Sequence, residues 1–414
     1  MDVVIVGAGQ AGLAVSYLLN QEHIQHVVLE RGKIGESWRS QRWESFHLNT
    51  PNWSNSLPGM EFDPHAPDAF GHRDQIVSYL ERYASAFDAP IRENAEVTAL
   101  ERLPTGRYRL CIGDDAIESR IAVVASGSTN RPRVPALAQK LPGDITSLTA
   151  GTYKSAEDLP DGAVLIVGSA QSGCQIAEDL ITAGRRVYLC ASRVGRIPRR
   201  YRGRDILAWW RDMGFWDVRV DELEDPALQF AALPQVSGTN GGHTVSFQSL
   251  ARDGVTLLGR LIDVDGYHLK LKPDLMESIQ FADEKSSAFK EAIDKFIRQT
   301  GITAPLPKPD PGEPTLPDLS GSERLDQLDL HRMSISSVIW CTGFDANWDW
   351  LRAGDFNEHG QPKHHDGIGS VPGLYFIGFS WLSKRKSGTL YGISEDAIRI
   401  VEHLRFFLDS AGPG

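Results

Sequence analysis

The stretch Asp2–Asn20, DVVIVGAGQAGLAVSYLLN, decides the fold of this chain. It starts with a run of β-branched residues, passes through a glycine-rich turn and ends in a helical pattern whose first residues are small. The turn, Gly7-Ala8-Gly9-Gln10-Ala11-Gly12, is a full G-x-G-x-x-G. Gly7 permits the tight turn, Gly9 lets the backbone approach a pyrophosphate, and Gly12 lets the helix pack against the strand. This order predicts a dinucleotide-binding βαβ unit, in which the positive end of the helix dipole faces the phosphates.

An acidic residue closes this first unit. The strand after the helix, Gln25–Glu30, ends in Glu30. That is roughly 20 residues beyond the turn, where a carboxylate accepts hydrogen bonds from a ribose diol. The same carboxylate repels a ribose phosphate, so the site predicts FAD or NAD and disfavours NADP. Its position at the N-terminus of the chain favours FAD.

A second unit of the same kind begins at Ala163. Residues Ala163–Ile181 contain the turn Gly168-Ser169-Ala170-Gln171-Ser172-Gly173, in which Ala170 replaces the middle glycine. The next strand ends at Ser192 without a carboxylate, and Arg193 follows. Because a guanidinium pairs with a phosphate through two hydrogen bonds, this site predicts NADPH. Arg199 and Arg200 are further candidates for phosphate contact, and a solvated basic loop is the alternative for these arginines.

The order of the segments predicts an α/β fold with two Rossmann-like dinucleotide-binding domains, the NADP domain being inserted in the FAD domain. We expect the FAD domain at 1–157 and 325–414. The NADPH domain is expected at 158–324, with a partly helical insertion at about 203–310 and a proline-rich linker at 303–318. Outside the two units, periodicity predicts helices at 73–87, 205–215, 285–299 and 395–408, and strands at 96–110, at 116–125 and from about 336 and 373.

The composition excludes several other classes of protein. The chain has 414 residues and a formal charge of −11, which argues against a nucleic-acid-binding surface. Its four cysteines, Cys111, Cys174, Cys190 and Cys341, have no metal-ligand spacing and fit a reducing cytosol. The sequence has no signal-peptide pattern and no apolar run of the roughly 18 residues that a membrane helix needs. We therefore expect a cytoplasmic protein with no membrane contact and no bound metal.

Four further segments resemble the class B flavin monooxygenases. They are Gly35–Pro51 (GESWRSQRWESFHLNTP), Val123–Pro135 (VVASGSTNRPRVP), Val338–Phe344 (VIWCTGF) and Leu374–Ile400 (LYFIGFSWLSKRKSGTLYGISEDAIRI). The chain is similar in particular to the bacterial CzcO-like flavoproteins, which are related to YUCCA-type and Baeyer–Villiger monooxygenases. The resemblance runs along nearly the whole chain and implies a glutathione-reductase-like arrangement of the two domains.

The resemblance also implies site residues. Trp38 and Trp43 would lie along the FAD, and Asn49 and Thr50 would lie close to the isoalloxazine, although core packing and turn formation are the alternatives. His243 is a candidate for reaching the flavin or the nicotinamide ribose, with an ordinary hydrogen bond as the alternative. The remaining implied positions near the cofactor or in the crossings between domains are Val97, Ser126, Gly127, Thr342, Gly343, Gly378 and the loop Leu390-Tyr391-Gly392.

The family reaction follows from the resemblance. NADPH would reduce FAD, the reduced flavin would form a C4a-(hydro)peroxide with O2, and one oxygen atom would be inserted into a small organic substrate by N-, S- or C-oxygenation or a Baeyer–Villiger reaction. The flavin needs a dry pocket and no side-chain nucleophile. One departure is Thr149, which stands where many family members carry a histidine before the second nucleotide turn. The missing imidazole puts the Baeyer–Villiger reaction in doubt.

Three alternatives remain open. An NADPH-dependent flavoprotein oxidase or reductase would consume NADPH without oxygen insertion. An amine N-hydroxylase shares both nucleotide turns but has a different C-terminal pattern. A non-enzymatic flavin-binding subunit would consume no NADPH. The expected partners are a small-molecule substrate and O2, and a homodimer is a further assembly to test. The sequence identifies neither the substrate nor the atom that is oxygenated.

Overall fold

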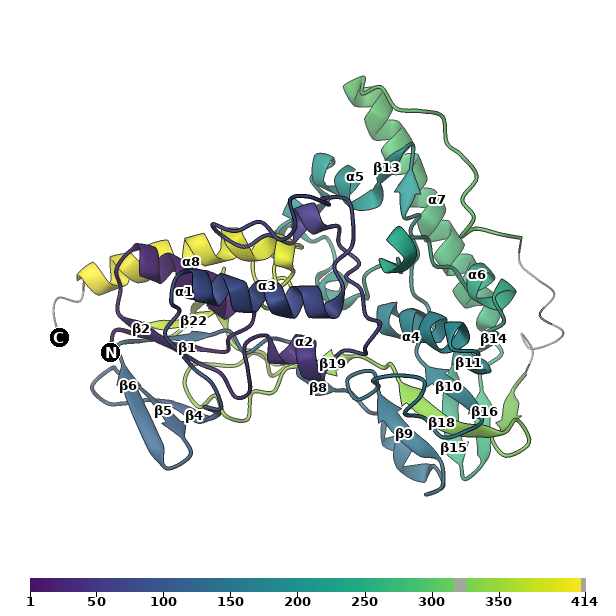
Figure 1. Ribbon diagram of the computed structural model, residues 1–414, viewed down its shortest axis with the longest axis horizontal. Helices are drawn as coiled ribbons and strands as arrows, with labels where there is room; N and C mark the ends of the chain where they lie inside the picture. Colours follow the sequence, from purple (N-terminus) through teal and green to yellow (C-terminus); the bar gives the residue numbers. More distant parts are fainter. Residues whose placement is uncertain (316–318, 320–324, 411–414) are drawn as a thin grey trace.

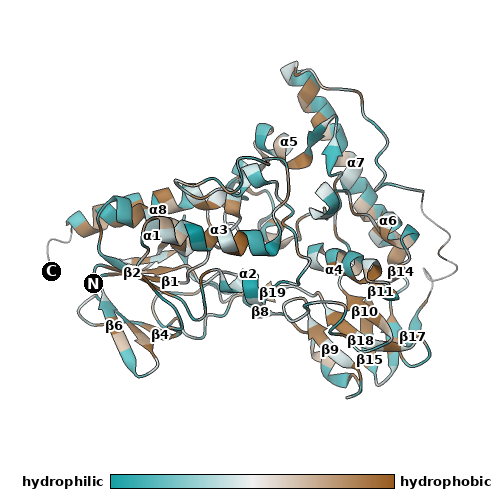
Figure 2. Ribbon diagram, viewed as in Figure 1, coloured by the Kyte–Doolittle hydropathy of each residue, from teal (hydrophilic) through white to brown (hydrophobic). Residues whose placement is uncertain are grey.

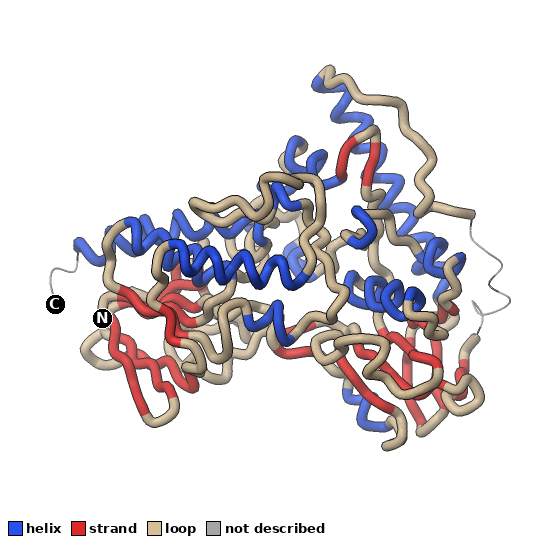
Figure 3. Tube along the Cα trace, in the orientation of Figure 1, coloured by secondary structure: helices blue, strands red, loops and turns tan. Residues whose placement is uncertain are grey.

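The structure is a computed structural model that describes residues 1–315, 319 and 325–410. Two large sheets, one mixed and one parallel, lie at opposite ends of the molecule, each with helices packed on it (Figure 1 and Figure 3). The predicted mixed α/β fold with parallel sheets is confirmed. The exact domain boundaries stay predictions. The boundary at 324 and the end of the linker at 316–318 lie outside the described residues.

The first sheet combines strands from both ends of the chain, in the order β20-β21-β22-β7-β1-β2-β3. Its strands are β1 (Val3–Val6), β2 (His26–Leu29), β3 (Ile91–Arg92), β7 (Ile121–Val124), β20 (His364–His365), β21 (Ile368–Gly369) and β22 (Leu374–Phe376). The pairs β1–β2, β1–β7, β7–β22 and β2–β3 are parallel. The carboxyl ends of β1, β7 and β22 therefore meet at one edge, where ligands bind in open α/β sheets.

The second sheet is parallel throughout, in the order β14-β11-β10-β18-β9. Its strands are β9 (Thr146–Thr149), β10 (Ala163–Val167), β11 (Val187–Cys190), β14 (Thr256–Leu258) and β18 (Ile335–Trp340). The central strands β1, β7, β10 and β11 are buried along their whole length. Figure 2 shows β1, β10 and β11 as hydrophobic runs, which is typical of parallel strands covered on both faces.

Helices cover both sheets. In the first half-molecule α1 (Gln10–Gln21) packs against α8 (Leu390–Ser410), with α3 (Arg73–Ala86) beside α1 (Figure 1). In the second, α4 (Gln171–Thr182) and α6 (Phe247–Arg252) lie near the long helix α7 (Leu275–Thr300). The short helices α2 (Glu36–Ser40) and α5 (Ile206–Asp212) complete the set among the described residues.

The helix bounds correct two expectations. Helix α7 begins at Leu275, ten residues before the predicted start at 285. Helix α8 begins at Leu390, so Leu390-Tyr391-Gly392 forms the first turn of a helix, whereas the resemblance implied a loop. The buried side chains of Leu390, Ile393 and Ala397 explain the earlier start, because their spacing continues the apolar face of α8 toward its N-terminus.

Smaller sheets connect the two halves of the molecule or lie at their periphery. The predicted strand at 96–110 is a hairpin of β4 and β5, and β6 extends it to three strands. Strands β8 and β19 pair between the two large sheets (Figure 1). The bounds are β4 (Val97–Arg102), β5 (Tyr108–Ile112), β6 (Asp115–Ser119), β8 (Arg131–Pro132), β12 (Arg200–Tyr201), β13 (Arg204–Asp205), β15 (Leu261–Asp265), β16 (His268–Leu271), β17 (Gln327–Asp329) and β19 (Phe344–Asp345).

Candidate functional site

The first glycine-rich turn has the geometry of a phosphate cradle. Gly7 has φ +108°, and a Cβ at this position would lie 2.6 Å from the carbonyl oxygen of Ala125. A Cβ at Gly12 would lie 1.9 Å from the carbonyl oxygen of Gly7. A Cβ at Gly9, in contrast, would meet no atom within 4 Å. Gly7 and Gly12 are thus required by the fold itself, whereas the absence of a side chain at Gly9 leaves open space over the turn.

The N-terminus of α1 faces that open space without a side-chain cap. The amide groups of a helix's first turn have no partner within the helix, and they attract anions. Glu30 lies beside them, with its carboxylate accepting hydrogen bonds from the amides of Ala8 (2.7 Å) and Gly32 (3.0 Å). Glu30 therefore fixes the turn, and its buried carboxylate lies where the sequence places the ribose contact.

The segment after Glu30 adds polar and aromatic groups. The indole of Trp38 donates a hydrogen bond of 3.1 Å to the side chain of Gln10. Trp43 is buried and packs edge-on against Phe46, so it belongs to the core. The hydroxyl oxygen of Ser126 is buried without a hydrogen-bond partner among the described residues. An orphan hydroxyl at this edge of the sheet is an observation that a bound cofactor would explain.

Arg42 is a charged group that the sequence analysis missed. Its guanidinium lies 5.4 Å from the ring centre of Trp38, and it forms no ion pair with any residue in the described ranges. Burial lowers its pKa to about 10, so it remains protonated at neutral pH. A partly buried cation without a carboxylate partner favours an anionic ligand. The sequence feature that could have indicated Arg42 is its position between Trp38 and Trp43, which were both predicted to lie along the FAD.

Asn49 is held from the other half of the molecule. Its side-chain oxygen accepts a hydrogen bond of 2.9 Å from Gln175 of α4, and its carbonyl oxygen accepts one of 2.7 Å from Arg199. Thr50 donates a hydrogen bond of 2.7 Å to Asn55, which is fully buried. Both residues are therefore fixed in place by side chains that the sequence did not connect to them.

Gly378 lies against the first glycine-rich turn, because a Cβ there would come within 2.7 Å of the Cβ of Ala11. Its positive φ of +82° suits glycine. Gly127 has the same backbone conformation at the end of β7, with φ +82°. Leu390 is buried at the start of α8, and Val97 is buried at the start of β4. The structure thus brings Gly378 to the predicted flavin edge and places Leu390 and Val97 in the core.

The second turn repeats the geometry of the first. Gly168 has φ +102°, and a Cβ there would lie 2.5 Å from the carbonyl oxygen of Cys341, next to Thr342. A Cβ at Gly173 would lie 1.9 Å from the carbonyl oxygen of Gly168, the same distance as in the first turn. Ala170 is the N-cap of α4 and gives no side-chain cap. Two stretches that look alike in sequence are therefore also alike in structure.

The residues around the second turn have internal partners. The hydroxyl of Ser169 accepts a hydrogen bond of 2.9 Å from the amide of Ser192, which joins the turn to the end of β11. The side-chain amide of Gln171 exchanges hydrogen bonds with the backbone of Val236. Ser172 lies partly exposed in the first turn of α4. The segment that contains Val236 thus forms a wall beside the turn, which the sequence gave no reason to expect.

Arg193 is exposed and shares an aromatic ring with a second cation. Its guanidinium lies 4.8 Å from the ring centre of Phe281, and the ammonium of Lys285 lies 5.4 Å from the same centre. Neither cation forms an ion pair within the part of the chain that the structure describes. Two positive charges without ion pairs, Arg193 after β11 and Lys285 on α7 beside it, fit a 2′-phosphate. Sequence analysis predicted Arg193 but missed Lys285, because α7 comes roughly 90 residues later.

Arg199 and Arg200 differ from Arg193. The guanidinium of Arg199 is buried and bonded to Asp205 through two nitrogens, at 2.8 and 2.6 Å. Arg200 donates to the carbonyl oxygens of Gly241 and Gly242. Arg199 therefore has a structural partner in place of a phosphate. Both arginines line a cavity of about 620 Å³ that His243, Lys308 and the proline-rich segment 305–312 also line.

His243 is anchored at this cavity by two hydrogen bonds. Its Nε2 lies 2.5 Å from a carboxylate oxygen of Glu178, and its Nδ1 lies 3.2 Å from the carbonyl oxygen of Thr239. The hydrogen bond to Glu178 raises the pKa of His243 above its usual value. Two acceptors facing the two ring nitrogens favour the imidazolium form. The side chain thus joins α4 to the segment that follows Gly242.

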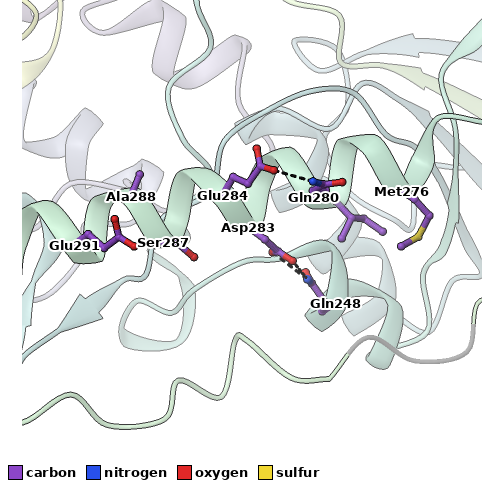
Figure 4. A pocket seen from close by; sticks show the side chains of 9 residues that line it. Gln248, Met276, Gln280, Asp283, Glu284, Ser287, Ala288 and Glu291 are labelled. Carbon is purple, nitrogen blue, oxygen red and sulfur yellow. Dashed lines mark hydrogen bonds between the residues drawn. The ribbon is translucent and has the colours of Figure 1, made fainter.

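A second hollow lies along α7 and contains none of the predicted site residues. Figure 4 shows its lining, which includes Asp283, Glu284 and Glu291. Three carboxylates would repel a phosphate-bearing cofactor.

Within the described ranges no group of histidine, cysteine or carboxylate side chains is placed to hold a metal ion. No helix in the same ranges is long and apolar enough to cross a membrane.

Known proteins of similar sequence indicate the class of oxidoreductase that this chain resembles. Residues 4–208 match the family model described as pyridine nucleotide-disulphide oxidoreductase. The chain is 28% identical over 411 residues to an uncharacterized CzcO-like oxidoreductase of Geobacillus kaustophilus, which covers 98% of both chains. It is 26% identical to the probable indole-3-pyruvate monooxygenase YUCCA1 of Arabidopsis thaliana, covering 96% of this chain and 88% of the plant protein. These similarities support the resemblance of the chain to the class B flavin monooxygenases.

A solved structure agrees with this family on the fold. The OTEMO complex with FAD and NADP superposes with a TM-score of 0.59 at 16% identity, covering 99% of this chain and 85% of that one. All four cysteines of the chain are free thiols. Cys174, Cys190 and Cys341 are buried, and burial raises the pKa of each thiol. Buried thiols with raised pKa values are poor nucleophiles.

Proposed function

We propose that this chain is an FAD- and NADPH-dependent monooxygenase that inserts one atom of O2 into a small organic substrate. The observation that carries the proposal is the contrast between the two nucleotide turns. The first ends in the carboxylate of Glu30, and the second is followed by the unpaired cations of Arg193 and Lys285. A ribose diol suits the first site and a ribose phosphate suits the second. The OTEMO structure, which holds FAD and NADP, supports the same pair of cofactors.

The residues present at the first turn fit FAD. The open space at Gly9 and the uncapped amides of α1 would receive the pyrophosphate, and Glu30 would bind the ribose. The orphan hydroxyl of Ser126 and the unpaired guanidinium of Arg42 supply a donor and a positive charge at the same edge. When bound, the flavin supplies the redox chemistry and the activation of O2.

The chain's own part in the reaction is to bind and orient the cofactor and the substrate, and to exclude water from them. Asn49 presents its side-chain amide NH2 group in a fixed position, because Gln175 and Arg199 hold its two oxygens. A preorganised donor of this kind stabilises charge that develops during a reaction without reorganisation. Trp38, Trp43 and Phe46 form an apolar wall that keeps water from the same segment.

One experiment tests both cofactor assignments and the oxygen transfer. The FAD-loaded protein is mixed anaerobically with NADPH or NADH, and flavin bleaching is followed by absorbance. In air, product and hydrogen peroxide are then quantified per NADPH consumed with ketones, amines, thioethers and indolic compounds. We expect faster bleaching by NADPH and an oxygenated product with one compound class. Failure to bind FAD, or equal bleaching by NADH, contradicts the proposal.

An oxidase is the second candidate, and Thr149 is the observation that favours it. The hydroxyl of Thr149 lies 3.2 Å from that of Thr152 in the same turn, so this position offers no imidazole to the second nucleotide. An oxidase would release all consumed reducing equivalents as hydrogen peroxide with every compound tested. That outcome of the same experiment would assign the oxidase reaction.

A further inference from the structure

The cavity of about 620 Å³ beside Arg200 lies apart from both nucleotide turns. Its lining includes neither Arg193 nor Lys285 and no residue of the two glycine-rich turns, all of which the structure describes. Glu178 of α4 does line it, seven positions after Gln171, the first residue of the helix. At a rise of about 1.5 Å per residue, Glu178 lies roughly 10 Å along α4 from the amides that would face a nucleotide. The cavity is therefore a second place for a ligand in this half of the molecule, with room for a small organic molecule.

The proline-rich segment 305–312 forms one wall of this cavity. The segment is tied to the rest of the protein, because the hydroxyl of Thr244 donates a hydrogen bond of 2.6 Å to Asp310. The hydroxyl of Ser246 donates another, also of 2.6 Å, to the carbonyl oxygen of Gly312. Proline and leucine side chains of the segment give this wall apolar atoms, in contrast to the charged residues of the remaining lining.

Most charged groups of the lining have a partner of opposite charge within the structure. These ion pairs are Glu178–His243, Asp253–Arg252, Asp205–Arg199 and Asp294–Arg202. Asp310 has no cationic partner among the described residues, but its two carboxylate oxygens accept hydrogen bonds from the hydroxyl of Thr244 and the amide of Gly312. These groups are satisfied by the protein itself.

Arg200 and Lys308 are the cations of the lining that form no ion pair within the described part of the chain. Arg200 donates hydrogen bonds of 2.7 and 2.8 Å to the carbonyl oxygens of Gly242 and Gly241. These neutral acceptors orient the guanidinium without cancelling its charge, and further N–H groups remain on it. The ammonium of Lys308 forms no hydrogen bond with a described residue. Two uncompensated positive charges, one from β12 and one from the proline-rich segment, therefore line one cavity.

The backbone next to Arg200 is strained. Arg202 and Gly203 form the two-residue turn between β12 and β13, with φ +50° and +78°. Such a turn favours asparagine, aspartate or glycine at its first position, because a positive φ is unfavourable for other side chains. Strained residues cluster at ligand sites, where the surrounding structure holds them in place. The hairpin thus holds Arg200 beside the cavity at a conformational cost.

We propose that this cavity binds a small phosphate monoester, with its phosphate on Arg200 and Lys308 and its organic part against the proline-rich segment. A phosphate monoester carries about −1.5 to −2 charges at neutral pH, which matches two free cations better than the single charge of a carboxylate does. A guanidinium binds phosphate oxygens through paired N–H groups, and a lysine binds them as a point charge.

Glu178 suits a hydroxyl group on the organic part of the ester. Its second carboxylate oxygen, Oε2, is buried without a hydrogen-bond partner among the described residues. A buried acceptor of this kind calls for a donor from water or from a ligand. Binding of the ester does not depend on the monooxygenase function proposed above.

The site is tested by calorimetry on the full-length protein with FAD added, in a buffer free of phosphate. The titrants are ribose 5-phosphate, glycerol 3-phosphate, inorganic phosphate and, as an uncharged probe, ribose. We expect at least one ester to bind, inorganic phosphate to bind more weakly because it lacks the organic part, and ribose not to bind. Lys308→Gln and Arg200→Gln should each raise the dissociation constant of the ester about fivefold or more.

Matched variants separate a lost phosphate contact from a general effect of charge. Arg332→Gln and Lys363→Gln remove exposed cations outside the lining and should leave the dissociation constant unchanged. Arg200→Lys should keep part of the affinity, because it retains the charge. Arg193→Ala should also have no effect on the ester, since Arg193 belongs to the predicted 2′-phosphate contact.

The outcomes distinguish this site from the proposed function. Equal affinity for ribose and ribose 5-phosphate, equal affinity in Lys308→Gln, or no binding of either ester overturns the phosphate site. Equal affinity for inorganic phosphate and the esters overturns the contact with the organic part. Loss of ester binding in Arg193→Ala would assign the ester to the predicted nucleotide site. If NADPH does not bleach the flavin, the proposed function fails while the titrations still decide the ester site.

Discussion

The side-chain amide of Gln175 donates a hydrogen bond of 2.9 Å to the side-chain oxygen of Asn49. Gln175 belongs to α4 of the second nucleotide unit, and Asn49 belongs to the segment that follows the first. Gln175 is 4% exposed, so the hydrogen bond is shielded from water. Arg199 holds the carbonyl oxygen of Asn49 from the same side. The half that carries the second nucleotide turn therefore fixes Asn49, which the resemblance to the family implies to lie close to the isoalloxazine.

Gln175→Leu should uncouple the reaction while FAD remains bound. The substitution leaves the oxygen of Asn49 without a donor and frees its amide to rotate, and small misplacements at a reacting centre are costly. We expect product formed per NADPH to fall by about half or more, with the difference recovered as hydrogen peroxide. Gln299→Leu, at an exposed position of α7, is the matched control. Unchanged coupling in Gln175→Leu would show that the contact has no part in orientation.

Arg193 and Lys285 should decide the choice between NADPH and NADH. Removing either charge weakens contact with the 2′-phosphate and leaves NADH unaffected. For Arg193→Ala we expect the KM for NADPH to rise about tenfold, and for Lys285→Ala by a smaller factor, with kcat preserved. Lys295→Ala, another exposed lysine of α7, serves as the control. A parallel rise in the KM for NADH would contradict a phosphate contact.

The sequence predicted the parts of the fold that depend on local pattern. Gly7 and Gly168 both require positive φ, and the apolar runs of β1 and β10 are long enough to identify a buried parallel strand. The same holds for Glu30, whose distance from the turn is set by one helix and one strand. These features are encoded within about 30 consecutive residues, so they can be read without tertiary information.

The parts that escaped prediction depend on tertiary contacts. Lys285 shares the ring of Phe281 with Arg193 only because α7 packs beside the segment after β11, and Gln175 contacts Asn49 only because the two halves pack together. The absence of an ion pair at Arg42 is likewise invisible in the sequence, where it stands near Arg39 and Glu44. Arginine clusters look alike until the structure shows which members have carboxylate partners.

Gly9→Ala and Gly12→Ala should fail in different ways. A methyl at position 9 meets nothing within 4 Å, so the protein should fold with an unchanged melting temperature and bind FAD about tenfold or more weakly. A methyl at position 12 would lie 1.9 Å from the oxygen of Gly7, so this variant should lose stability before any ligand is added. Thermal unfolding and flavin fluorescence measure the two effects. Full FAD affinity in Gly9→Ala would exclude a close approach of the pyrophosphate at this residue.

The ion pair of His243 with Glu178 predicts a pH-dependent contribution to stability. The folded-state pKa of His243 is raised, first by the hydrogen bond that its Nε2 donates to Glu178, so the pair stabilises the fold fully below the unfolded value of 6.5. This contribution is lost as the pH rises through the folded-state pKa. His243→Gln should therefore lower the melting temperature at pH 6 and have a smaller effect at pH 9.

The expected size of this effect is set by solvent exposure. The side chain of His243 is 38% exposed, so solvent screening keeps the pair within the range of partly exposed ion pairs. In a chain of this length such a pair changes the melting temperature by about 1 to 2 °C. The measurement is thermal unfolding of wild type and variant at both pH values, with the exposed His65→Gln as the control. An equal loss at pH 6 and pH 9 would mean that His243 contributes through packing and neutral hydrogen bonds, because only a charged imidazole gives the difference.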